Sequence, residues 1–284
     1  MIGVLAGVLL AVVPVDGASV HAGAPGSFAA RPDTVVDTVY VASNRRRVAR
    51  GFTRELTDSL WYGVYVTRLV TRAADAPRPL ASMHVTRVDS AALEEAEWRR
   101  RLAGAVRDTS ASAAALVYVH GYSSSPGTAV TQGLQVRARG GHHGPLVVFL
   151  WPTHELYVVP TPVHVYRDDA RAAARSGRPL ARVLRAVDSL APGSVLVAHS
   201  MGSRVALDAV ITDSAAHAQF AARPLRAMGI FSPDVSASVF RETFAPQLPG
   251  IARRVALYGA SRDYVLGASA IFNRERRAAG IARR

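Results

Sequence analysis

The sequence predicts a three-layer α/β fold, in which helices cover both faces of a mostly parallel sheet. Strand-like and helix-like segments alternate along the chain, which is the order of a parallel sheet joined by crossover helices. The strand segments 114–119, 145–151 and 194–198 are apolar and do not alternate with polar residues. Both faces of these strands should therefore be buried, as in the centre of a parallel sheet.

The other expected elements follow from residue type and spacing. Further strands, the early ones rich in Val and Tyr, are expected at residues 35–42, 62–70, 83–88, 227–231 and 254–258. A helix is expected at 91–106, with Ser90 as its cap, because its apolar residues lie near one helical face. Segments 128–139 and 168–190 are long enough for crossover helices, which must be right-handed.

Length and composition favour one domain, expected at residues 33–284. The chain has 284 residues, 49% of them hydrophobic, which is enough for one substantial core. Residues 1–32 are interpreted as a signal peptide and linker, because residues 1–14 form an apolar run of signal-peptide length. This predicts export to the periplasm or the exterior; a buried N-terminal element is the alternative. No other stretch approaches transmembrane length, so no stable membrane insertion is expected.

The strong positive charge is interpreted as a composition bias. The net charge is +13, and all 34 basic residues are Arg. Runs such as 45–47 and 99–101 are expected to be solvated faces, so no nucleic-acid partner is expected. A polyanion site, the weaker alternative, would bind with a steep salt dependence. The absence of cysteine excludes disulfides and thiolate catalysis.

Ser200 has the sequence context of a nucleophile elbow. It follows an apolar strand and precedes a helix-like segment, with Ala198 and Gly202 two positions away on either side. The sharp strand-to-helix turn of an elbow strains the central residue and crowds these two positions, so both must be small. No other serine in the chain combines these features. A serine that merely caps a helix is the alternative.

Acyl transfer also needs backbone N–H groups directed at the developing oxyanion. One donor comes from the residue after the nucleophile, here Met201, and one from the loop after an earlier strand. Gly121 lets the chain turn at the end of the strand 114–119, so Tyr122 is the expected second donor. His120 is a candidate base, although an orienting structural role fits its place beside the glycine better.

The chain resembles the α/β-hydrolase superfamily, and in particular an uncharacterised, esterase- or lipase-like bacterial branch. Four blocks occur in that branch's order, V-H-G-Y, F-x-W-P, A-H-S-M-G and P-D-V, here at residues 119–122, 149–152, 198–202 and 233–235. The opening strand 39–45 and the helix positions Tyr166, Asp169, Ala173 and Ser176 also match. The resemblance implies a catalytic acid after the strand 254–258, which is Asp263, with Asp234 as the competitor.

The chain departs from this family at the catalytic base. The triad order in α/β-hydrolases is Ser, then Asp or Glu, then His, but no histidine follows Asp263. The resemblance implies a further helix, strand and histidine loop, so the sheet is expected to lack its last strand. Without a base Ser200 is a poor nucleophile. His154 is the candidate substitute, because it follows the W-P turn at the same sheet edge; His199 should point away from the serine hydroxyl.

The remaining polar and aromatic candidates have modest roles. Trp151, Tyr122 and Tyr157 could line an acyl pocket, with core packing as the preferred interpretation of Trp151. His142 and His143 lack further ligands at a recognisable spacing, so an exposed loop is expected and no metal is implied.

The expected function is hydrolysis of a small-molecule carboxylic ester, with amides as the less favoured substrates, through a Ser200 acyl-enzyme and without a cofactor. The alternative is a non-catalytic protein of the same fold, either truncated or a binding module. Specificity and oligomeric state do not follow from the sequence.

Overall fold

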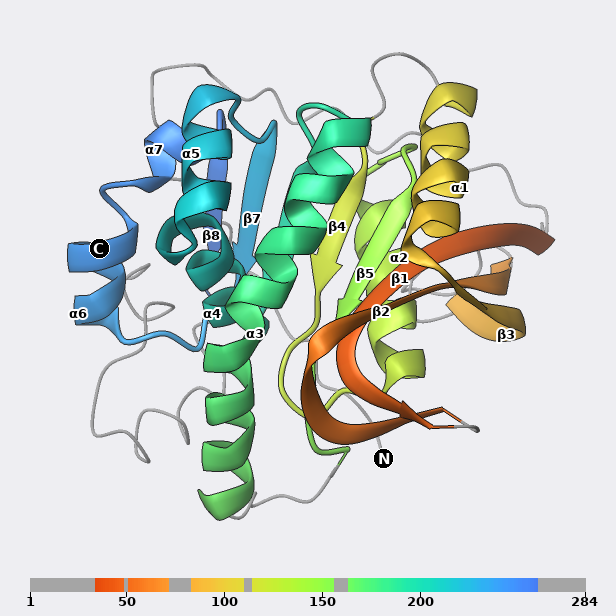
Figure 1. Ribbon diagram of the computed structural model, residues 1–284, viewed down its shortest axis with the longest axis horizontal. Helices are drawn as coiled ribbons and strands as arrows, with labels where there is room; N and C mark the ends of the chain where they lie inside the picture. Colours follow the sequence, from red (N-terminus) through yellow and green to blue (C-terminus); the bar gives the residue numbers. More distant parts are fainter. Residues whose placement is uncertain (1–33, 49–50, 72–82, 110–113, 156–162, 260–284) are drawn as a thin grey trace.

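The computed structural model describes residues 34–48, 51–71, 83–109, 114–155 and 163–259 (Figure 1). Three of the expectations above lie outside these residues: the signal peptide and linker at 1–32, Tyr157, and the acid Asp263.

The described strands form one eight-stranded sheet in the order β3-β2-β1-β5-β4-β6-β7-β8. Their bounds are β1 Thr34–Val48, β2 Gly51–Thr71, β3 Met83–Leu93, β4 Leu116–Val119, β5 Leu146–Leu150, β6 Val195–His199, β7 Ala227–Phe231 and β8 Val255–Tyr258. Neighbouring strands in the part of the sheet ordered β1-β5-β4-β6-β7-β8 pair in parallel. Strand β2 is antiparallel to both β1 and β3. The expectation of a mostly parallel sheet is thereby confirmed.

Helices cover the two faces of this sheet unequally (Figure 1). The α-helices are α1 Glu95–Asp108, α2 Pro126–Arg139, α3 Val163–Leu190, α4 Gly202–Leu207, α5 Ser214–Ala222, α6 Ala237–Val239 and α7 Leu248–Ile251; two π-helical turns are η1 Asp208–Thr212 and η2 Phe240–Phe244. Helix α2 lies on one face, and α1, α3, α4 and α5 lie on the other. The result is the expected three-layer arrangement.

The apolar central strands explain why two helical layers are needed. In β4, Val117 and Val119 join the core beneath α1 and α3, whereas Leu116 and Tyr118 join the core beneath α2. Side chains of a strand alternate between the two faces of a sheet, so a strand without polar positions must be covered on both. Strands β4 and β5 are buried along their whole length, as expected.

The three N-terminal strands are longer than expected, and this corrects one helix start. Residues 91–93 belong to β3, where Ala91 pairs with Val64 and Leu93 with Tyr62. Ser90 is therefore a strand residue rather than the helix cap, and α1 begins only after Glu94. The apolar residues of this segment do have helical spacing, but residues 91–93 form backbone hydrogen bonds with β2 instead of joining the helix. No helix in the described part of the chain is long and apolar enough to cross a membrane.

Candidate active site

Ser200 occupies a sharp turn between β6 and α4. Its φ is 52°, in the left-handed region that non-glycine residues rarely adopt. Three backbone hydrogen bonds hold it there: Ser200 N–H donates to the Phe231 carbonyl at 2.8 Å, and its own carbonyl accepts from Ser203 N–H at 2.9 Å and Asp234 N–H at 3.2 Å. A strained residue that its neighbours over-determine is typical of a functional site.

The residues around the turn are small for a steric reason. A Cβ added to Gly202 would collide with the carbonyl oxygen of His120, which belongs to the rigid backbone after β4. Ala198 is completely buried between its neighbours. The turn therefore has the tight geometry of a nucleophile elbow, and glycine is required at position 202, two residues after the serine.

The loop after β4 passes directly against this turn. A Cβ added to Gly121 would lie 2.7 Å from Nδ1 of His199 and 3.0 Å from Cβ of Ser200, so a larger residue here would force His199 or Ser200 to shift. Tyr122 follows on the loop, and Met201 follows Ser200 and is 1% exposed. The structure thus brings the two expected oxyanion-hole segments together at the carboxyl edge of the parallel strands, where ligands bind in such sheets.

His120 is a structural residue. It is fully buried, and its ring stacks on Trp151 with 5.4 Å between centroids and 8° between planes. Nδ1 lies 2.9 Å from the Gly121 carbonyl, which can only accept, so this nitrogen carries the proton. Burial lowers the pKa of His120 to about 3, and Nε2 has no hydrogen-bond partner among the described residues. The imidazole is neutral and enclosed, which does not suit a base for Ser200.

Trp151 belongs to the core rather than to a pocket wall. It is fully buried, and its indole N–H donates to the His120 carbonyl at 2.7 Å. The ring therefore links the end of β5 to the loop after β4, and core packing is the role its surroundings support.

His154 pairs with a carboxylate from α3. Its Nδ1 lies 2.6 Å from Oδ1 of Asp169, and both carboxylate oxygens accept from the His154 backbone N–H at 3.1 Å. The Asp169 side chain is 3% exposed and that of His154 is 12% exposed. Burial raises the pKa of Asp169, and the contacts with His154 oppose that rise. With the carboxylate ionised, Nδ1 is the protonated nitrogen, which leaves Nε2 as an acceptor.

Asp234 is held by Tyr166 of helix α3, the helix that also carries Asp169. Tyr166 donates its hydroxyl proton to Oδ2 of Asp234 at 2.7 Å, in a buried contact. The backbone N–H of Asp234 binds Ser200, so this carboxylate stands next to the turn. The ring of Tyr166 lies 6.2 Å from the ring of Tyr122. These contacts support a bracing role for Asp234.

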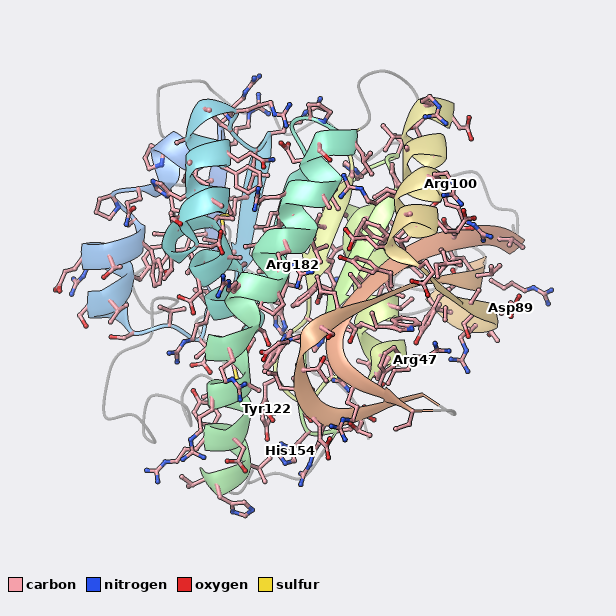
Figure 2. All side chains as sticks on the ribbon, in the orientation of Figure 1. Arg47, Asp89, Arg100, Tyr122, His154 and Arg182 are labelled. Atoms are coloured by element: carbon pink, nitrogen blue, oxygen red, sulfur yellow. The ribbon has the colours of Figure 1, made fainter. Side chains whose placement is uncertain are left out.

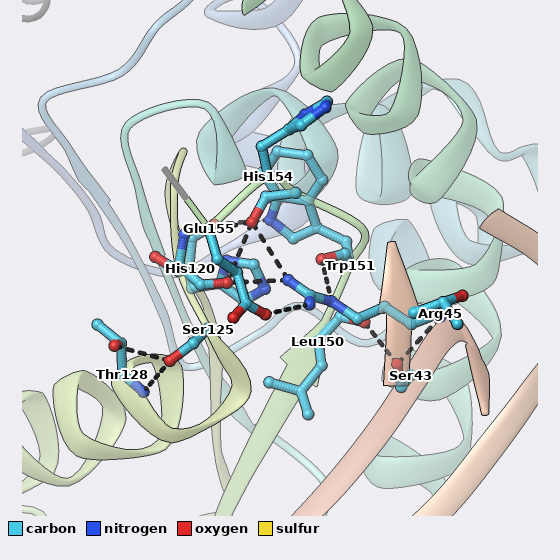
Figure 3. A network of polar contacts seen from close by, with 12 residues as sticks. Ser43, Arg45, His120, Ser125, Thr128, Leu150, Trp151, His154 and Glu155 are labelled. Carbon is cyan, nitrogen blue, oxygen red and sulfur yellow. Dashed lines mark hydrogen bonds and ion pairs between the residues drawn. The ribbon is translucent and has the colours of Figure 1, made fainter. Parts of the chain in front are cut away.

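Arg45 is the residue of this region that sequence reasoning missed. The run 45–47 was expected to be a solvated face, and this is wrong for Arg45, which is only 2% exposed, whereas Arg46 and Arg47 are exposed. The available signal was position, because Arg45 follows the apolar part of β1, whose pairing with β5 ends at Ser43. Figure 3 shows its guanidinium among the loops of that edge.

Strained backbone is concentrated at this edge. Among the described residues, the non-glycine positions with positive φ are Ser123, Ser200 and Ser232, and each lies just beyond the end of β4, β6 or β7. The described residues hold no group of three or more potential metal ligands. His142 instead contacts the Ala114 carbonyl through Nε2 at 2.6 Å, before the start of β4 and β5.

A mostly parallel sheet between two helical layers, with a strained serine between a central strand and its helix, defines the α/β-hydrolase class. The chain belongs to the family described as "Alpha/beta hydrolase of unknown function (DUF900)", whose model matches residues 94–282, about two thirds of the sequence. No curated protein matches the chain.

Proposed function

We propose that this protein is a serine hydrolase that cleaves carboxylic esters, and amides less readily, through an acyl-enzyme at Ser200. The observation that carries the proposal is the left-handed conformation of Ser200, at a turn that admits only glycine at position 202. A serine that only begins a helix does not need this conformation, whereas a nucleophile elbow requires it to present the hydroxyl to a substrate.

The reaction would proceed through two tetrahedral intermediates. The Ser200 oxygen attacks the ester carbonyl, its proton passes to a base, and the alcohol leaves as the acyl-enzyme forms; water then repeats the sequence and releases the acid. The backbone N–H groups of Tyr122 and Met201 would stabilise the oxyanion. The close approach of Gly121 to Ser200 supports this assignment, because a preorganised pair of donors must flank the nucleophile.

His154 is the base that we propose for this reaction, with Asp169 as the group that orients it. The pair reproduces the carboxylate–imidazole half of a triad, since Asp169 selects the tautomer in which Nε2 can accept a proton. The enclosure and lowered pKa of His120 argue against it as the base. Asp263, the acid that the family resemblance implies, lies outside the described residues, and Asp169 takes that role in this proposal.

A non-catalytic binding protein is the second candidate. The observation that favours it is that, within the described residues, the hydrogen bonds that hold Ser200 are made by its backbone. A serine hydroxyl without a base is a neutral, weak nucleophile; removing the histidine of a comparable triad costs roughly a million-fold in kcat. The fold would then serve to hold a ligand.

The test is hydrolysis of a series of p-nitrophenyl esters of increasing acyl length by wild type, Ser200→Ala and Ser203→Ala. Ser203 is a matched control, because it is a fully buried serine three residues away whose hydroxyl has no partner among the described residues. We expect wild type and Ser203→Ala to turn over at similar rates and Ser200→Ala to be inactive. Equal rates for all three proteins would refute the hydrolase and favour the binding protein.

A further inference from the structure

Arg45 lies just beyond the point where β1 stops pairing with β5. The last pair of that parallel ladder joins Ser43 to Leu150, and the register with β2 shifts between Ser43 and Arg45. At this irregularity the Arg45 side chain turns into the protein. A charged group at that depth has lost its hydration and needs several hydrogen-bond partners.

The guanidinium satisfies this need with groups from two different loops (Figure 3). Its Nε donates to the Trp151 carbonyl at 3.0 Å, and Nη2 donates to the Ser124 carbonyl at 2.9 Å and to Oγ1 of Thr153 at 3.2 Å. Nη1 lies 3.1 Å from Oε1 of Glu155, whose side chain is 47% exposed. Arg45 therefore joins the loop after β4 to the turn after β5.

The loop after β4 is held at both of its ends. At His120 the carbonyl accepts from the Trp151 indole. At Ser124 the carbonyl accepts from the Thr153 hydroxyl at 3.1 Å and from Arg45, and the N–H donates to the same hydroxyl at 3.2 Å. Ser123, between the anchors, has a strained φ of 56°. This backbone is held in one conformation by its partners rather than by its own preference.

We propose that Arg45 is a positioning residue for the oxyanion hole: by holding the Ser124 carbonyl, it sets the direction of the Tyr122 N–H. The inference rests on the proposed function, because it assigns Arg45 to the oxyanion donor of that reaction. Stability alone is a poor explanation of this arginine, since a buried cation with one half-exposed carboxylate contact gives up hydration that an apolar residue would not need. The planar fork of an arginine, unlike a lysine ammonium, can hold two loops at once.

The test compares Arg45→Met and Arg45→Lys with wild type and with Arg47→Met. Arg47 is a suitable control, because it is exposed on the same strand and stacks over Trp61 (Figure 2). We expect kcat on p-nitrophenyl esters to fall about 100-fold or more in both Arg45 variants, with KM changed by less than about threefold, since an oxyanion donor acts in the transition state. Arg47→Met should keep the wild-type kcat.

Amide hydrogen exchange separates this inference from the proposed function. In Arg45→Met the peptide covering residues 120–125 should exchange at least about tenfold faster, while peptides from β4 and β6 exchange as in wild type. Unchanged exchange in that peptide would overturn the inference whether or not the protein hydrolyses esters. If Arg45→Met exchanges faster throughout, Thr153→Val is the second variant, because it removes only the hydroxyl that binds both Ser124 and Arg45. The same loop-specific effect is expected there, and its absence would also overturn the inference.

Discussion

Asp169 holds His154 at three points: its Oδ1 lies 2.6 Å from the imidazole Nδ1, and both carboxylate oxygens accept from the backbone N–H. The carboxylate comes from α3 and the histidine from the turn after β5, so a crossover helix orients a residue at the carboxyl edge of the sheet. These contacts fix the ring, the tautomer and the backbone of His154 together.

This relationship predicts that His154 and Asp169 act as one unit in hydrolysis. His154→Gln and Asp169→Asn should each lower kcat by about 100-fold or more. The kcat of the double variant should be only slightly lower than that of the more impaired single variant. Steady-state kinetics on the best p-nitrophenyl ester measures this. His164→Gln is the control, because His164 is exposed near the start of α3. Full activity in both single variants would assign the base elsewhere.

The strain at Ser200 predicts a stability difference between two inactive variants. A left-handed conformation costs a non-glycine residue roughly 1–2 kcal/mol, and glycine avoids this cost but gains entropy in the unfolded chain. Ser200→Gly should therefore have a free energy of unfolding up to about 1 kcal/mol above that of Ser200→Ala. Urea unfolding of the two proteins decides the question. A less stable glycine variant would contradict the φ of 52°.

Alanine substitution at Gly202 and at Gly104 should change the free energy of unfolding in opposite directions. Gly202→Ala drives a Cβ into the His120 carbonyl, so we expect a loss of about 3 kcal/mol in the free energy of unfolding, the upper range for overpacking. Gly104 lies inside α1 with open space around its Cα, so Gly104→Ala should gain up to about 1 kcal/mol from helix propensity. Thermal and urea unfolding of both variants test the pair. A Gly202→Ala protein as stable as wild type would refute the tight turn.

His120 should make the protein less stable as the pH falls. The folded-state pKa of His120 is about 3, lowered mainly by burial from 6.5. Below pH 6.5 the unfolded chain binds a proton there that the folded protein does not, so the free energy of unfolding decreases by up to about 1.4 kcal/mol per pH unit until about pH 3. The raised pKa of Asp169 acts in the opposite direction, because the folded carboxyl binds its proton more readily.

Substitution isolates the contribution of His120. Urea unfolding from pH 6.5 to 4.5 should give a steeper fall in stability for wild type than for His120→Asn, with His164→Gln as the exposed control. Equal slopes for all three proteins would mean that His120 is protonated in the folded state.

The N-terminal strands show where prediction from sequence stops. Residues 91–106 carry a helical pattern of apolar positions, yet residues 91–93 pair with β2 in the sheet. Local periodicity cannot reveal a ladder whose partner lies about thirty residues earlier in the chain. In the same way, the arginine run 45–47 has no internal sign that one member is buried and the other two are exposed.

The sequence by itself determined the central strands and the Ser200 turn, because both depend on local patterns: an unbroken apolar run must be covered on both faces, and a strained serine needs small neighbours. Only the tertiary structure decided which side chains meet at the carboxyl edge. Arg45 reaches partners 79 and 106 residues away, and Tyr166 reaches Asp234 across 68 residues. Such contacts follow from how the crossover helices pack and where the strand ladders end, which no short stretch of sequence encodes.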